Sequence, residues 1–542
     1  MIGLALWLCA ALAPGQEEPK TVGEPLQDAV PVRDRWRIPF PDYPLNQPGN
    51  GIDPYHQNTL KGDYPILGQN IFAALTARSD TTIETRRVPT PSGVSAAGAG
   101  RLDFFGEGEQ LFFVQDFAGT VEVFKGETAF RPRDWEVRVT GILNYTYLEV
   151  EEHGIVNPNV DDKKDRPDRK FSLQEALAEY HLLDLSDNYD FVSVRAGIQP
   201  FVSDFRGLLF SDTNLGARLF GTLANNRVQW NLVAFDQLEK DTNSDLNTHH
   251  RREQQVYIAN LYVQDFLWPG YTAQVSFHYS RDDGDLEYDD NDVLVRPALI
   301  GAVREHDVDA LFFGWAGDGH IGRLNLTHAV YAARGKDEFN QIAGGETDIA
   351  AHLAALEVSY DIDWLRLRGS FLWASGDKDV DDDLATGFDS IFEAPNFAGG
   401  TFSFWNRQAV KLQGVNLVNR NSHLPDLRSS KTQGQMNFVN PGLFLYNAGA
   451  DLEILPELRA VVNASLLRFQ YTEPLESFTQ QRGIHKDLGF DVGVGLIGRP
   501  LLNNNVQFTL GTSAFFPGTG FGDLFEDRDT LYSVFAQLSL TY

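Results

Sequence analysis

The sequence predicts an all-β fold, an antiparallel β-barrel of about 18 strands (16–20) formed by residues 71–542. Two observations predict it. From residue 71 onward, segments of about 10 to 14 residues alternate apolar and polar side chains with period two, as strands between two different environments do. From residue 171 to the end, short turns and long polar connections alternate between these segments, which is the hairpin arrangement of a transmembrane barrel.

The connections fix the predicted strand count. The short ones carry turn-forming residues and lie at 186–190, 224–227, 268–271, 317–320, 361–363, 455–458 and 501–505. The long ones lie near 200–213, 239–253, 281–305, 334–347, 376–440, 472–487 and 516–529. They separate 15 strands from residue 171 onward, and strands near 71–79, 109–124 and 134–149 bring the count to 18. An even count places both ends of the barrel region on the side of the short turns, the periplasmic side.

The N-terminal part is expected to lie outside the barrel. Residues 1–15 contain an apolar run followed by small residues, which is typical of a signal peptide, although no Lys or Arg precedes the run. The single cysteine, Cys9, lies in this run and follows Leu8, where lipid attachment would need a small residue. Residues 16–70 are irregular and Pro-rich, which excludes a sheet interior and predicts a periplasmic lead-in or a partial plug.

One segment, SLQEALAEYHLLDL at 172–185, is compatible with a strand or with an amphipathic helix. Its residues are good helix formers, so propensity alone favours the helix. Its position in a run of strands, and the alternation of Ala176, Ala178 and Tyr180 with Leu177 and Glu179, favour the strand. We therefore predict a strand.

The two faces of the strands indicate two different solvents. In the segment 192–199, one face carries only apolar residues and the other carries Ser193, Arg195 and Gln199. A membrane barrel turns its apolar face to lipid and its polar face to a water-filled lumen, the inverse of a soluble barrel. Aromatic residues near strand ends, such as Trp268, match the girdles at membrane interfaces. The sequence thus predicts a barrel in the bacterial outer membrane.

Composition and motifs restrict the function. The net charge of −30, from 75 acidic and 45 basic residues, argues against a nucleic-acid partner. Neither a G-x-S-x-G nor an H-E-x-x-H motif is present, so we expect neither an enzyme nor a cofactor. A barrel-embedded enzyme stays open as an alternative, because its catalytic groups would come from positions distant in the sequence.

Arginines recur on the polar face of the predicted strands and predict a lumen that attracts anions. In DWLRLRGSFLW, Arg366 and Arg368 alternate with apolar residues. Arginine rings set anion selectivity in pores, and the guanidinium group suits carboxylate recognition. The predicted lumen and selectivity residues are Arg195, Arg218, Arg323, Arg366, Arg368, Arg459 and Arg499. The alternative is that arginines pair with lumen acids such as Glu136, Glu179, Glu357 and Asp491.

An acidic run is the one candidate for a metal site. It consists of Asp377, Asp379, Asp381 and Asp383. The run lacks the Gly and the Glu of an EF-hand calcium loop, so a solvated acidic loop is the preferred interpretation. Loose bridging by divalent cations to neighbours bearing lipopolysaccharide is the alternative.

Two stretches, residues 194–221 and 365–392, resemble alginate-export-type outer-membrane proteins. The second contains a strand ending in Ser375, Gly376 and Asp377, followed by a long acidic loop that ends near a Phe. The resemblance implies an 18-stranded monomeric barrel whose Arg-lined constriction passes an anionic polymer or small anionic solutes. The C-terminal strand ending in Tyr542 also resembles the signal by which the barrel-assembly machinery recognises outer-membrane proteins.

The predicted function is therefore an outer-membrane channel, a porin or exporter, that passes anionic solutes such as acidic saccharides. The expected partners are outer-membrane lipid and lipopolysaccharide, the barrel-assembly machinery and an anionic small-molecule or polysaccharide substrate. The alternatives are a barrel that serves as a sheath or scaffold for a periplasmic or extracellular protein, and the barrel-embedded enzyme.

Overall fold

The computed structural model describes residues 58–91, 104–126, 131–157, 159–290, 292–412, 417, 420–526 and 528–542. The predicted signal peptide and most of the predicted lead-in lie outside this part of the chain. The barrel, its turns and most of its long connections lie within it.

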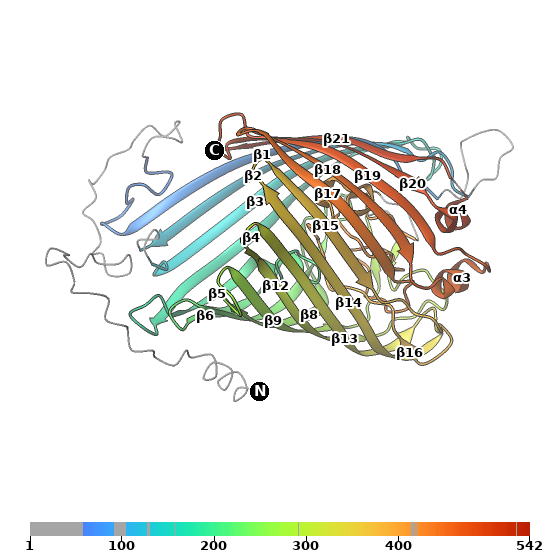
Figure 1. Ribbon diagram of the computed structural model, residues 1–542, viewed down its shortest axis with the longest axis horizontal. Coiled ribbons are helices and arrows are strands. Elements are labelled where there is room, and N and C mark those ends of the chain that lie inside the picture. Colours follow the sequence, from blue (N-terminus) through green and yellow to red (C-terminus); the bar gives the residue numbers. More distant parts are fainter. Residues whose placement is uncertain are drawn as a thin grey trace.

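One closed antiparallel barrel forms the structure (Figure 1). Its sheet has 19 strands, and the two-residue β16 (Leu384–Ala385) only joins β14 in parallel, which leaves 18 barrel strands as predicted. The first and last strands pair from Arg78 with Thr541 to Arg86 with Ser533 and close the barrel. The barrel strands are β1 (Ile71–Arg87), β2 (Glu109–Lys125), β3 (Trp135–Val150), β4 (Asp165–Asp184), β5 (Phe191–Val202), β6 (Ser211–Leu223), β7 (Val228–Lys240), β8 (Asn247–Val263), β9 (Tyr271–Asp282), β12 (Val308–Ile321), β13 (Leu324–Asn340), β14 (Gly345–Ile362), β15 (Leu365–Ala374), β17 (Leu443–Leu455), β18 (Leu458–Phe469), β19 (Asp487–Gly498), β20 (Val506–Pro517) and β21 (Leu531–Thr541).

The other elements lie in the long connections. They are the hairpin β10 (Glu287–Tyr288) and β11 (Leu294–Arg296), the 3-10 helix η1 (Gly400–Phe402), and the helices α2 (Phe404–Gln408), α3 (Glu473–Thr479) and α4 (Thr519–Phe525). Among the described residues, none of these helices has the length and apolar character that crossing a membrane would take. Figure 1 shows α3 and α4 at the end of the barrel opposite the C-terminus.

The ambiguous segment is a strand. β4 (Asp165–Asp184) covers residues 172–184 and pairs with β3 on one edge and β5 on the other. The backbone hydrogen bonds to β3 and β5 stabilise the strand by more free energy than the helix propensity of these residues would contribute to a helix.

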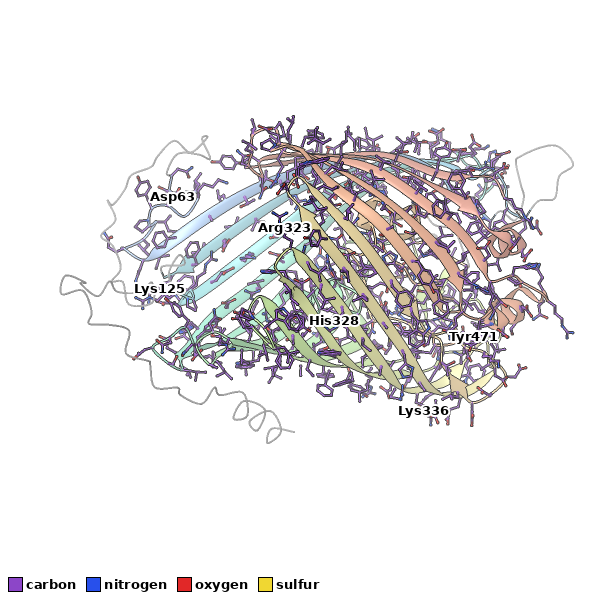
Figure 2. All side chains as sticks on the ribbon, viewed as in Figure 1. Asp63, Lys125, Arg323, His328, Lys336 and Tyr471 are labelled. Atoms are coloured by element: carbon purple, nitrogen blue, oxygen red, sulfur yellow. The ribbon has the colours of Figure 1, made fainter. Side chains whose placement is uncertain are left out.

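Several connection bounds differ from the prediction. β13 and β14 leave only residues 341–344 between them, and β7 and β8 leave only 241–246. These strands continue into the polar stretches because cross-strand ion pairs support them there, as Lys336 Nζ and Glu346 Oε1 do at 2.9 Å. The predicted turn at 317–320 is part of β12, and the turn itself is Gly322 and Arg323. Figure 2 shows Lys125 toward the short-turn end and Lys336 and Tyr471 toward the long-connection end.

The outside of the barrel is apolar, as β9 illustrates. In β9, Val275, Phe277 and Tyr279 are exposed, while Gln274 and Ser276 face the interior and are buried. A closed barrel that exposes such a surface is stable in lipid, and single-chain barrels with an even number of strands are those of bacterial outer membranes. The chain is therefore an outer-membrane barrel.

The longest connection of the barrel, residues 375–442, is called the inner loop here. Its described residues, 375–412, 417 and 420–442, occupy the interior of the barrel. A long connection at 376–440 was predicted; that it packs inside the barrel was not. Phe404 is fully buried, Trp405 is 1% exposed, and the ring of Phe402 stacks on Phe535 of β21 with 6.0 Å between ring centroids. Apolar side chains of this size gain free energy by leaving water, so the loop folds back into the barrel.

Candidate functional site

A carboxylate on β1 fixes the inner loop to the barrel wall. Glu84 accepts hydrogen bonds from Arg407 Nη2 at 2.7 Å, Gln408 Nε2 at 2.7 Å and Ser533 Oγ at 2.6 Å. Arg86 of the same strand donates to Gln408 Oε1 at 2.6 Å. Glu84 and Arg86 are fully buried. Charged groups removed from water must be paired in this way, so the end of α2 is fixed beside β1 and β21.

A second carboxylate, on β19, holds the start of α2. Asp491 accepts hydrogen bonds from the Ser403 hydroxyl, from the Phe404 backbone N–H at 3.0 Å and from the Trp405 backbone N–H at 3.2 Å. The start of a helix has unpaired N–H groups that favour a negative charge. Asp491 was predicted to be one of the acids that could neutralise arginines. In the structure its described partners are Ser403, Phe404 and Trp405, so it positions the inner loop instead.

The shorter connection 203–210, between β5 and β6, packs beside the inner loop. Phe210 and Phe392 form a parallel bridge, and the Ala394 N–H donates to the Gly207 carbonyl at 3.1 Å. Arg206 reaches β14 from this connection, where its Nη2 lies 2.9 Å from Glu357 Oε1. The interior of the barrel is thus divided by two chain segments.

Two cavities lie on either side of the inner loop. One, of about 630 Å³, lies toward the short-turn end; its lining has four arginines and three carboxylates, which are Arg206, Arg366, Arg368, Arg459, Asp318, Glu357 and Asp451. The other, of about 430 Å³, lies toward the long-connection end, and its charged lining residues are Arg407, Arg420, Asp116 and Asp245. Thr401 of the inner loop lines both cavities, so this residue marks where they adjoin.

Three predicted arginines come together in the larger cavity. Arg366 pairs with Asp361, with 3.0 Å from Nη2 to Oδ2. Arg368 lies between Asp451 at 3.3 Å and Glu357 at 3.9 Å. Arg459 makes no ion pair with any of the described residues within 4.0 Å. Arg366 and Arg368 are therefore paired with acids, as the alternative interpretation expected, and Arg459 is not paired among the described residues. That these arginines select anions stays a prediction.

Two predicted arginines lie in the wall but line neither cavity. Arg195 and Arg218 are directly opposite each other on β5 and β6. Arg195 Nε donates to Glu179 Oε2 at 2.8 Å, and Arg218 Nε donates to Asn231 Oδ1 at 2.8 Å. The pairing of Arg195 with Glu179 is the one that the alternative interpretation expected.

The last two predicted arginines are placed in turns, so their assignment to the lumen wall is corrected. Arg323 lies between β12 and β13, with its side chain 59% exposed and 3.6 Å from Asp363. Arg499 is exposed and follows the last residue of β19. Both strands end before the arginine, so period-two alternation does not apply to these positions.

Three cavity arginines were missed by the sequence analysis. Arg206, Arg407 and Arg420 come from connections, where strand periodicity carries no information. A signal for the inner loop was nevertheless present in the sequence. Large apolar residues such as Phe388, Phe392 and Phe438 are unusual in a solvated loop and indicate one that packs against the protein.

The carboxylates of the acidic run are not grouped closely enough to share one ion in the structure. Asp379, Asp381 and Asp383 are exposed. Asp377 is buried and accepts hydrogen bonds from the Asp379 N–H at 3.3 Å and from Thr386 Oγ1 at 3.4 Å. Burial raises the pKa of Asp377 to about 7. Its carboxyl group therefore shapes the start of the inner loop.

The chain was compared with known protein families, curated proteins and solved structures. No family model and no curated protein matches the chain. Similar solved structures include Pseudomonas aeruginosa OprD (12% identity, 87% of this chain and 95% of that chain, TM-score 0.46), Pseudomonas aeruginosa OpdK with vanillate (9%, 86% and 98%, 0.45) and Acinetobacter baumannii OccAB4 (10%, 86% and 97%, 0.45). The resemblance to alginate-export-type proteins stays a prediction.

Proposed function

We propose that this outer-membrane barrel is a channel that passes anionic solutes through the larger cavity. The observation that carries the proposal is the gathering of four guanidinium groups, from β15, β18 and the connection 203–210, in one cavity. Three carboxylates share the lining, and Asp361 beside it pairs with Arg366, so acids and arginines match in number there. Arg459 is the arginine of the lining without an ion pair among the described residues. Its field acts within about 8 Å at physiological salt, which is the scale of a cavity this size.

Acidic saccharides are the solute class that the lining suits best. A volume of about 630 Å³ accommodates a small organic molecule. The arginines supply planar donors for carboxylates, while Asn325, Ser359 and Asn396 supply partners for hydroxyl groups. The aromatic rings of Phe205 and Phe397 line the same space.

The sheath or scaffold alternative is disfavoured by the inner loop. A partner threaded through the barrel would have to occupy the space that Phe402, α2 and their contacts with β19 and β21 fill. Displacing buried aromatic side chains and a paired Glu84 would cost several kcal/mol.

Replacing Arg459 with alanine should weaken anion selectivity. We expect the wild-type channel to prefer anions in planar lipid bilayers, and the Arg459→Ala channel to show a reversal potential shifted toward cation preference. The reason is that no acid of the described residues lies within 4 Å of the Arg459 guanidinium to compensate its charge. The measurement is the reversal potential in a salt gradient.

Arg499→Ala is the matched control, because it removes the same charge from an exposed turn outside the cavity. Its reversal potential should equal that of the wild type. Cation preference in the wild type, or equal shifts in the two variants, would contradict the proposal.

A further inference from the structure

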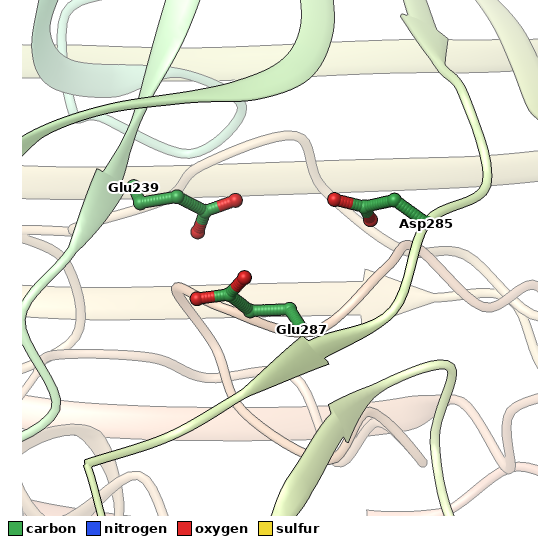
Figure 3. Close-up of side chains that lie close together, drawn as sticks. All are labelled: Glu239, Asp285 and Glu287. Carbon is green, nitrogen blue, oxygen red and sulfur yellow. The ribbon is translucent and has the colours of Figure 1, made fainter.

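Three carboxylates meet at the long-connection end of the barrel, outside both cavities. Glu239 lies at the end of β7, and Asp285 and Glu287 lie in the connection between β9 and β12 (Figure 3). One carboxylate oxygen from each residue lies within 4.8 Å of the others. Figure 3 shows the three carboxylate groups directed toward one another.

One guanidinium group compensates part of this charge. Arg296 is fully buried and donates from Nη2 to Glu239 Oε1 at 2.5 Å and to Asp285 Oδ2 at 3.0 Å, and from Nε to Asp285. Arg296 is the one arginine that bonds directly to this cluster among the described residues. Arg252 and His250 act on the cluster electrostatically, and neither makes a hydrogen bond or an ion pair with it. Like charges at this separation repel each other strongly where water is scarce.

The group also has an oxygen atom without a partner. Glu239 is 5% exposed, and its Oε2 atom accepts no hydrogen bond from the described residues. Glu287 makes no side-chain hydrogen bond or ion pair with the described residues, so both of its carboxylate oxygens remain available. A buried carboxylate oxygen without a donor is costly, and such atoms point to an unseen partner.

We propose that Glu239, Asp285 and Glu287 bind a divalent cation, and that calcium is the preferred ion. Carboxylate oxygens are the ligands of hard cations, and calcium accepts the irregular geometry that three side chains from two separate segments provide. Magnesium demands a near-ideal octahedron and fits this arrangement less well. Arg296 bonds to Glu239 through Oε1, so Oε2 is the oxygen of Glu239 that is left for the cation.

The position of the cluster connects it to the inner loop. Arg296 donates from Nη1 to the Gln433 carbonyl at 2.8 Å, and nearby Arg252 donates from Nη2 to the Gly434 carbonyl at 2.9 Å. A cation bound to Glu239 and Glu287 would hold the end of β7 and the β9–β12 connection together. The connection would in turn hold the inner loop through Arg296. The site is thus expected to stabilise the loop, independently of which solute the channel passes.

Calcium titration of the full chain, folded in detergent, tests the site. We expect saturable binding of about one Ca²⁺ per chain, with a Kd in the range of about 10⁻⁴ to 10⁻³ M typical of extracellular sites, and weaker binding of Mg²⁺. Glu287→Gln should weaken calcium binding about tenfold or more, because it removes the carboxylate that makes no ion pair while keeping its shape. Glu239→Gln should do the same.

Glu305→Gln is the control, since it removes one negative charge from an exposed position in the same connection. It should leave calcium affinity unchanged. Addition of Ca²⁺ should also protect residues 282–308 and the inner loop from protease in the wild type and not in Glu287→Gln. Absence of saturable calcium binding, or equal affinity in the wild type and Glu287→Gln, would overturn the proposal.

Discussion

Replacing Glu84 with alanine is expected to release α2 from the barrel wall and to raise the conductance of the channel. The substitution leaves the Arg407 guanidinium buried without its carboxylate, and it removes the acceptor that Gln408 and Ser533 share. Removing one partner of a buried ion pair costs about 3–5 kcal/mol, which is enough to displace a short loop helix. Single-channel recordings in planar bilayers measure the effect, and proteolysis within 375–442 reports the release.

Glu179→Ala is the control for this experiment. It also deletes a carboxylate that pairs with an arginine. Arg195 belongs to the wall, however, and among the described residues it bonds to Glu179 and not to Glu84, Asp491 or the inner loop. We expect its conductance and its proteolysis within 375–442 to stay near wild type. If Glu84→Ala had the conductance and the proteolysis within 375–442 of the wild type, the Glu84–Arg407 pair would not be what holds the inner loop in place.

Replacing Gly493 with alanine should displace the inner loop by a different mechanism. A Cβ atom at this position of β19 would overlap the backbone carbonyl of Phe402. A backbone atom cannot rotate away as the end of a flexible side chain can, so the inner loop itself would have to move. Overpacking of a well-packed interior costs about 1–3 kcal/mol. The expected result is a higher and noisier single-channel conductance.

Gly119→Ala provides the matched substitution, because a Cβ atom at that position of β2 meets no atom within 4 Å. Its conductance should equal that of the wild type. If Gly493→Ala and Gly119→Ala gave the same conductance, the close approach of Phe402 to β19 would not limit the channel.

The barrel itself could be predicted because its physical cause repeats along the sequence. Lipid on one side and water on the other impose period two on every strand, so the strand count and the positions of Arg366 and Arg368 followed from local patterns. Arg323 and Arg499 were misassigned because strand ends are set by turn geometry. A shift of two residues there moves a side chain from the wall into a turn.

The contents of the barrel could not be predicted in the same way. A loop that folds inward has no fixed period, and its contacts join residues far apart in the sequence, as Glu84 and Arg407 are. The carboxylate of Asp491 illustrates the difficulty: its position on the polar face of β19 was clear, but its partners are backbone N–H groups of α2. Only the apolar residues of the inner loop gave a sequence signal for its burial.

Uptake of a hexuronate and of a neutral hexose of equal ring size into liposomes is the measurement that tests the central claim most directly. With wild-type chain in the membrane, the hexuronate should enter faster, because its carboxylate can pair with the Arg459 guanidinium in the larger cavity. In Arg459→Ala liposomes the ratio of the two rates should fall, while Arg499→Ala liposomes should keep it. Equal rates in the wild type, or faster entry of the neutral hexose, would contradict the proposal that this channel selects anionic solutes.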